Sequence, residues 1–122
     1  MSEFLERITA AHLPEQERPV FSNHPSFAGV RLATLVAGQQ SGGAMKTLLV
    51  RLEPGARMLP HCHEREAEQH LVLDGEGEAM VGDKRLVYHP GALSLIPRGE
   101  QHSVLAGERG MMILATFCAS PS

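Results

Sequence analysis

The chain has 122 residues, a length that fits one domain with a single core. Hydrophobic residues make up 43% of it and charged residues 20%, which is typical of soluble globular proteins and excludes a disordered or membrane-embedded chain. The formal net charge is -3 and Lys and Arg form no run. We therefore expect no nucleic-acid partner, because phosphate binding needs a concentrated positive surface.

The N-terminus lacks the basic segment and following apolar run of a secretory signal, and no stretch approaches the roughly 20 apolar residues of a transmembrane helix. The chain has two cysteines, Cys62 and Cys118, too few for a disulfide framework. We therefore expect a cytoplasmic protein without a membrane partner. A single bridge between the two cysteines stays open at this point.

The first 29 residues are predicted to form an N-terminal arm. Residues 2–13 place apolar side chains roughly on one side, which favours a short helical turn. Prolines and polar residues over 14–25 favour an extended segment, because proline fixes φ and cannot donate a backbone hydrogen bond. An arm of this kind often lies against a neighbour.

The chain beyond the arm is a series of short β-prone segments separated by glycine-rich turns. This spacing is typical of an all-β sandwich or barrel and differs from that of alternating strands and helices. The predicted strands are, in chain order, 30–37, 44–52, 68–74, 77–81, 84–88, 92–96, 102–105 and 111–117.

Two stretches carry the residue types of a metal site. The first places His61, His63 and Glu68 within eight positions. In a strand, residues two apart point to the same face, so both imidazoles can aim inward while Cys62 points away. A turn then allows Glu68, at the head of the next strand, to return a carboxylate to the same point.

The second stretch runs over 91–102 and delivers His102 after a turn, which adds a third imidazole. Three imidazoles and one carboxylate suit one divalent transition metal, namely Fe, Mn, Ni, Zn, Co or Cu. The same set disfavours Ca and Mg, which prefer oxygen ligands. On a metal that takes five or six ligands, one or two positions stay open for chemistry.

These stretches closely resemble the two motifs of the cupin superfamily. The fixed positions that match are Gly55, His61, His63, Glu68 and Gly75 in the first motif, and Gly91, Pro97, Gly99 and His102 in the second. One position departs, because Ala106 stands where the family usually has Asn. That Asn is not a ligand, so the departure affects the loop more than metal binding.

The resemblance implies an antiparallel jelly-roll barrel, or double-stranded β-helix, over 30–117, with 118–122 as a C-terminal tail. It also implies the four metal ligands His61, His63, Glu68 and His102. A homodimer is a further implication, often with an N-terminal strand exchanged between protomers. The resemblance does not imply a reaction, because one fold can host many chemistries.

Three more residues are candidates near the cavity. Alternation places His70 beside Glu68 and Val72, where it could act in proton transfer or simply hydrogen-bond to the metal carboxylate. Arg57 could face the cavity and bind a carboxylate substrate, and Arg98 could overhang the cavity mouth, although exposure to solvent is the simpler interpretation of both.

The leading functional hypothesis is a metal-dependent enzyme acting on a small organic molecule, with a dioxygenase as first subclass. The second hypothesis is a non-catalytic ligand-binding or sensory module. The third is a redox-neutral, metal-dependent isomerase or lyase. An enzyme would keep an open metal position with access to it, whereas a structural site would be closed.

Overall fold

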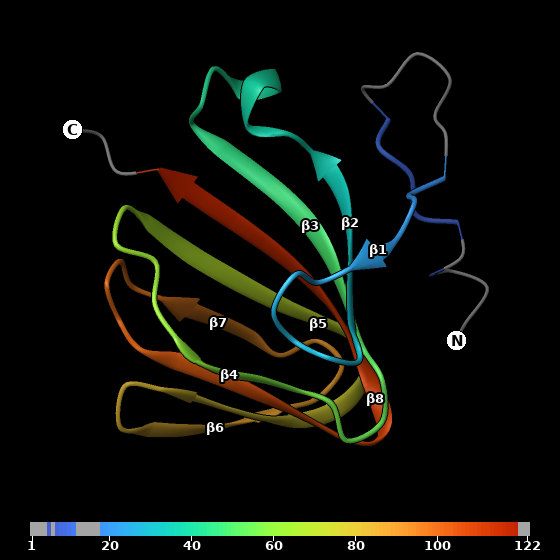
Figure 1. The fold of residues 1–122 in the computed structure, drawn as a ribbon, viewed down its shortest axis with the longest axis vertical. Coiled ribbons are helices and arrows are strands. Elements are labelled where there is room, and N and C mark those ends of the chain that lie inside the picture. The colour runs from blue at the N-terminus through green and yellow to red at the C-terminus, as the bar shows by residue number, and fades with distance from the viewer. Residues whose placement is uncertain (1–4, 6, 12–17, 120–122) are drawn as a thin grey trace.

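The computed structural model describes residues 5, 7–11 and 18–119, and most of these lie in β-strands (Figure 1). No helix in this part of the chain is long and apolar enough to cross a membrane. A short 3-10 helix, η1 (Gly38–Ser41), joins the second and third strands. The strands are β1 (Ser22–Asn23), β2 (Val30–Val36), β3 (Met45–Leu52), β4 (Arg57–His61), β5 (Glu66–Val81), β6 (Lys84–Tyr88), β7 (Leu93–Ile96) and β8 (His102–Ala119).

The two longest strands, β5 and β8, organise the sheet. They pair antiparallel along nearly their whole lengths. At one end β8 also pairs with β3 and β5 with β7, and at the other end β8 pairs with β4 and β5 with β6. Each long strand therefore runs through both layers of the barrel in Figure 1. This arrangement confirms the predicted all-β, antiparallel jelly roll.

The predicted strand ends differ from the observed ones at the bends of these two strands. Each long strand joins two predicted segments, 68–74 with 77–81 in β5 and 102–105 with 111–117 in β8. The glycines that suggested turns instead accompany register shifts in the ladder, between Val72 and Asp74 and between Gly75 and Gly77. Such bulges bend a strand without ending it.

Two hydrophobic clusters form on opposite faces of the sheet. The larger one fills the barrel and contains inward side chains of both layers, among them Val50, Met58 and Ile113. The smaller one lies on the other face, where Leu49 and Met112 are covered by Leu5 of the N-terminal segment. The described part of the predicted arm therefore packs on the barrel of its own chain, and burial of apolar surface holds it there.

The predicted helical turn over 2–13 lies partly outside the described residues. Of those described, Ile8 donates a backbone hydrogen bond to the carbonyl of Leu5 at 3.4 Å. Of the predicted extended segment, the structure describes residues 18–25. They include β1, which pairs with β2 of the same chain. The exchange of an N-terminal strand within a homodimer stays a prediction.

The close approach of β5 and β8 at their bend predicts a strong effect of Gly75→Ala on stability. Gly75 has a φ of +79°, and a Cβ there would overlap the carbonyl group of Gly110. We expect a loss of about 3 to 5 kcal/mol in the free energy of unfolding, from backbone strain and overpacking together. Gly91→Ala is the matched control, because Gly91 has a φ of +89° with open space around it.

The control should lose only about 1 kcal/mol, the cost of the left-handed conformation alone. Both values can be measured by urea unfolding of the two variants and the parent. Equal losses in the two variants would contradict the close approach of the two strands at this bend.

Candidate metal centre

Strand pairing brings the two histidine-bearing stretches together. His61 is the last residue of β4 and lies opposite His102, the first residue of β8, in the antiparallel register. His63 lies beyond the end of β4, so it does not follow the strand alternation that the sequence predicts. Instead, its carbonyl accepts a hydrogen bond of 2.8 Å from the backbone N–H of Gly99, which anchors this loop to the turn before β8.

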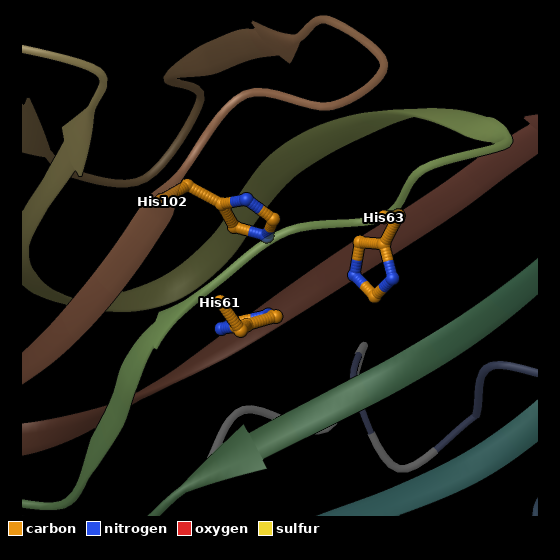
Figure 2. Close-up of side chains that lie close together, drawn as sticks. All are labelled: His61, His63 and His102. Atoms are coloured by element: carbon orange, nitrogen blue, oxygen red, sulfur yellow. The ribbon is translucent and has the colours of Figure 1, made fainter.

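The three imidazole rings converge on one point. Among the described residues, His61, His63 and His102 form the one group whose potential ligand atoms all lie within 4.8 Å of one another. Their ring centroids are 4.2 Å apart for His61 and His102, 5.2 Å for His61 and His63, and 5.4 Å for His63 and His102. Figure 2 shows the rings around a common space. This spacing allows all three to reach one metal ion.

Glu68 supplies a carboxylate next to these rings. It points into the barrel from β5 and is only 5% exposed. Its Oε1 lies 3.1 Å from Nε2 of His102 and 3.4 Å from Nε2 of His63. The structure therefore brings together all four residues that the sequence marks as candidate ligands.

Backbone carbonyls set the orientation of two of the rings. Nδ1 of His61 lies 2.7 Å from the carbonyl oxygen of Leu59, and Nδ1 of His102 lies 3.1 Å from that of Glu100. Because a carbonyl oxygen only accepts, each Nδ1–H donates. When the ring is neutral, its Nε2 atom then carries the free lone pair. This arrangement is typical of metal-binding histidines.

Two buried atoms test whether a metal fits here. Oε1 of Glu68 and Nε2 of His102 are both shielded from solvent and have no hydrogen-bond partner, although they lie 3.1 Å apart. Buried polar atoms are rarely left unpaired, because each costs about 1 to 3 kcal/mol of desolvation. A cation between them would satisfy both lone pairs, so the donor set and its surroundings fit a metal.

The electrostatics of the site favour a positive charge at the same place. Burial opposes ionisation of Glu68, but the neighbouring histidines hold the pKa of its carboxyl well below the usual range. Burial lowers the pKa of His61. Burial also opposes protonation of His102, yet contact with the Glu68 carboxylate raises its pKa. A metal ion can take the place of that proton, because it offers the carboxylate the same favourable charge.

The site is closed on one side and accessible on the other. Glu68 and His102 are buried, whereas His61 and His63 are half-buried. Two phenylalanine rings flank the accessible pair, with Phe27 5.4 Å from His61 and Phe117 5.1 Å from His63 between centroids. Sequence reasoning missed both rings, and the small number of aromatic residues in the chain was the one signal that could have drawn attention to them.

His70 lies on the inward face of β5 with Glu68 and Val72, as the alternation predicts, and is 1% exposed. Its Nε2 lies 2.7 Å from Oε2 of Glu68 and its Nδ1 lies 2.8 Å from the hydroxyl of Tyr88. Both ring nitrogens are thus engaged in hydrogen bonds. Sequence reasoning missed Tyr88, although a lone tyrosine in the chain at an inward strand position needs a polar partner.

The remaining candidates do not belong to the histidine cluster. Arg57 and Arg98 are both exposed, as the simpler interpretation predicts. Cys62 donates from its thiol to Glu64 at 3.4 Å, and this contact raises the pKa of the thiol. A reactive thiolate is therefore disfavoured. Cys62 and Cys118 are both free, so no bridge joins them.

Comparison with known proteins places this chain among proteins of the same architecture. It superposes on KdgF from Halomonas sp. with 17% identity and a TM-score of 0.72, covering 90% of this chain and 93% of that one. It also superposes on a predicted oxalate decarboxylase from Thermotoga maritima with 24% identity and a TM-score of 0.75, covering 92% of this chain and 98% of that one. An oxalate decarboxylase variant of Bacillus subtilis is similar with 20% identity and a TM-score of 0.70, and the match covers 94% of this chain but 29% of that longer one.

These identities establish a shared fold and no shared reaction. No curated protein matches the sequence. The family model described as the cupin domain matches residues 48–117, which is more than half of the chain and includes all four candidate ligands. By its sequence motifs, its jelly-roll fold and this match, the chain belongs to the cupin family.

Proposed function

We propose that this protein is a metal-dependent enzyme that acts on a small organic molecule, and that a dioxygenase reaction is the first to test. The metal would be held by His61, His63, Glu68 and His102. The observation that carries the proposal is the cluster of three imidazoles with the Glu68 carboxylate against two of them, in which one buried atom of Glu68 and one of His102 lack a hydrogen-bond partner.

The donor set limits the metal to the divalent transition series. Three imidazole nitrogens and one carboxylate oxygen suit Fe, Mn, Co, Ni, Cu or Zn. When bound, such a metal would supply Lewis-acid or redox chemistry at a coordination position that the protein leaves open. The half-buried side at His61 and His63 is where a small molecule would enter, and Phe27 and Phe117 would shield it from water there.

Two features support a dioxygenase as the first subclass. Oxygen chemistry is common at iron sites built from histidine and carboxylate ligands with open positions. The apolar rings beside the accessible histidines would also exclude water, which protects reactive intermediates from side reactions.

A redox-neutral lyase is the second candidate, and the names of two proteins with the same fold support it. The Thermotoga maritima and Bacillus subtilis proteins are both named for oxalate decarboxylation, in which a carbon–carbon bond of a small carboxylate is broken. The same four residues would hold a metal that, when bound, supplies a position for the substrate carboxylate and positive charge to stabilise developing negative charge. Mn, Zn or Ni would then suffice.

Removal of one ligand should abolish stoichiometric metal binding. We expect His61→Ala to purify with far less than one metal per chain, and to lose the rise in thermal midpoint that metal gives the parent protein. His89→Ala is the matched control, because His89 is exposed and makes only a local hydrogen bond to the carbonyl of Pro90. Elemental analysis with thermal melts measures both quantities. Unchanged metal content in His61→Ala would show that the site is wrongly placed.

The reaction class can be tested by elemental analysis of protein purified without added metal, followed by anaerobic reconstitution with Fe(II) and O2-uptake measurements. We expect near-stoichiometric iron and O2 consumption that depends on added substrate, screened among small carboxylates, diols and thiols. Zinc, manganese or nickel without O2 uptake would instead favour the lyase. Binding of those compounds without turnover under either condition would indicate a ligand-binding module.

A further inference from the structure

A chain of hydrogen bonds leads away from the candidate ligand Glu68 into the core. Oε2 of Glu68 lies 2.7 Å from Nε2 of His70, and Nδ1 of His70 lies 2.8 Å from the hydroxyl of Tyr88. That hydroxyl lies 2.6 Å from Oγ of Ser94. His70 and Tyr88 are each 1% exposed, so their hydrogen bond lies in the core, whereas Ser94 is half-buried.

Three strands supply this chain, and their pairing explains its geometry. His70 and Ser94 lie opposite each other in the register of β5 and β7, so their side chains share one face. Tyr88 reaches the pair from the end of β6, where it lies opposite Gly77. The residues thus come from adjacent strands on the inner wall of the barrel.

The donors and acceptors of the chain have one consistent direction when the imidazole is neutral. An ionised carboxylate only accepts, so Nε2–H of His70 donates to Glu68. Nδ1 of His70 then accepts from the hydroxyl of Tyr88, whose oxygen accepts from the hydroxyl of Ser94. Every buried polar atom of His70 and Tyr88 is satisfied in this arrangement.

The chain uses one oxygen of the carboxylate and leaves the other unpaired. Oε2 of Glu68 is engaged by His70, whereas Oε1 is buried, lacks a hydrogen-bond partner and faces His63 and His102. The hydrogen bond from His70 holds Oε2 on the side away from the histidine cluster, whereas Oε1 faces that cluster. Only one oxygen is therefore presented to the histidine cluster.

We propose that His70 is a positioning residue which, held in turn by Tyr88 and Ser94, makes Glu68 a one-oxygen metal ligand and so keeps a coordination position open. This inference rests on the proposed metal site. Its consequence is that the hydroxyl of Tyr88, whose hydrogen bonds run to His70 and Ser94, would influence how a metal is coordinated by Glu68.

A purely structural role for the chain predicts a different result. If these groups only satisfied one another in the core, their loss would lower the stability of the metal-free protein and leave the metal environment unchanged. Positioning requires instead that the metal environment change. The visible absorption of bound Co(II) separates the two, because its intensity and position depend on coordination number and geometry.

The decisive variant is Tyr88→Phe, which removes one hydroxyl and keeps the ring that packs in the core. We expect its Co(II) spectrum to change and its Co(II) affinity, measured by competition with a chelator, to fall about two- to tenfold, the usual effect of one hydrogen bond. His70→Leu should show a larger loss of about 10- to 100-fold, as is typical when a direct partner of a metal ligand is removed. His89→Leu, at an exposed histidine, should match the parent.

The double variant His70→Leu with Tyr88→Phe tests whether the two residues act in series. If Tyr88 acts through His70, the double variant should bind Co(II) no more weakly than His70→Leu alone. Additive losses would overturn the serial arrangement. His70→Gln, whose amide can still donate to Glu68, should recover part of the affinity and move the spectrum towards that of the parent.

The outcomes keep this inference distinct from the metal site itself. A parent protein that binds Co(II) only when His61 is intact, with a spectrum unchanged in Tyr88→Phe and His70→Leu, would overturn the inference and leave the site in place. A parent that binds no Co(II) would overturn both. If His70→Leu fails to fold, Tyr88→Phe and Ser94→Ala still decide, since each removes only one hydroxyl.

Discussion

The pairing of β5 with β8 is the constraint on which the rest of this structure depends. These strands share a ladder through both layers of the barrel, and each bends where glycines allow the backbones to approach closely. Glu68 lies near the start of β5, and His102 is the first residue of β8. The bend in each strand turns the sheet over the core and so brings these two residues to the same interior point.

Much of the candidate site could be predicted from sequence, because its candidate ligands follow a fixed spacing and its strands follow a simple alternation. His61, His63, Glu68 and His102 lie close together as that spacing predicts, and alternation placed His70 on the inward face beside Glu68. His63 converges for a reason other than the predicted one, since the strand ends at His61 and a hydrogen bond from Gly99 positions the loop.

Other features depend on contacts that no local pattern records. Tyr88 and Ser94 meet because β6 and β7 both pair with β5, and nothing in their own segments indicates that pairing. The bends in β5 and β8 were mistaken for strand ends, because a glycine that accompanies a bulge and a glycine that ends a strand look alike in sequence. The difference lies in whether a partner strand continues past the glycine.

The site also has a mechanical consequence. His61 ends β4, His63 lies in the following loop, Glu68 belongs to β5 and His102 begins β8. One ion held by all four would cross-link residues 61–68 to His102, a distant position in the sequence, in a chain whose two thiols are free. Because these side chains would be scattered in the unfolded chain, a metal would bind the folded state in preference, and would fasten the start of β8 to the loop and strand that carry the other ligands.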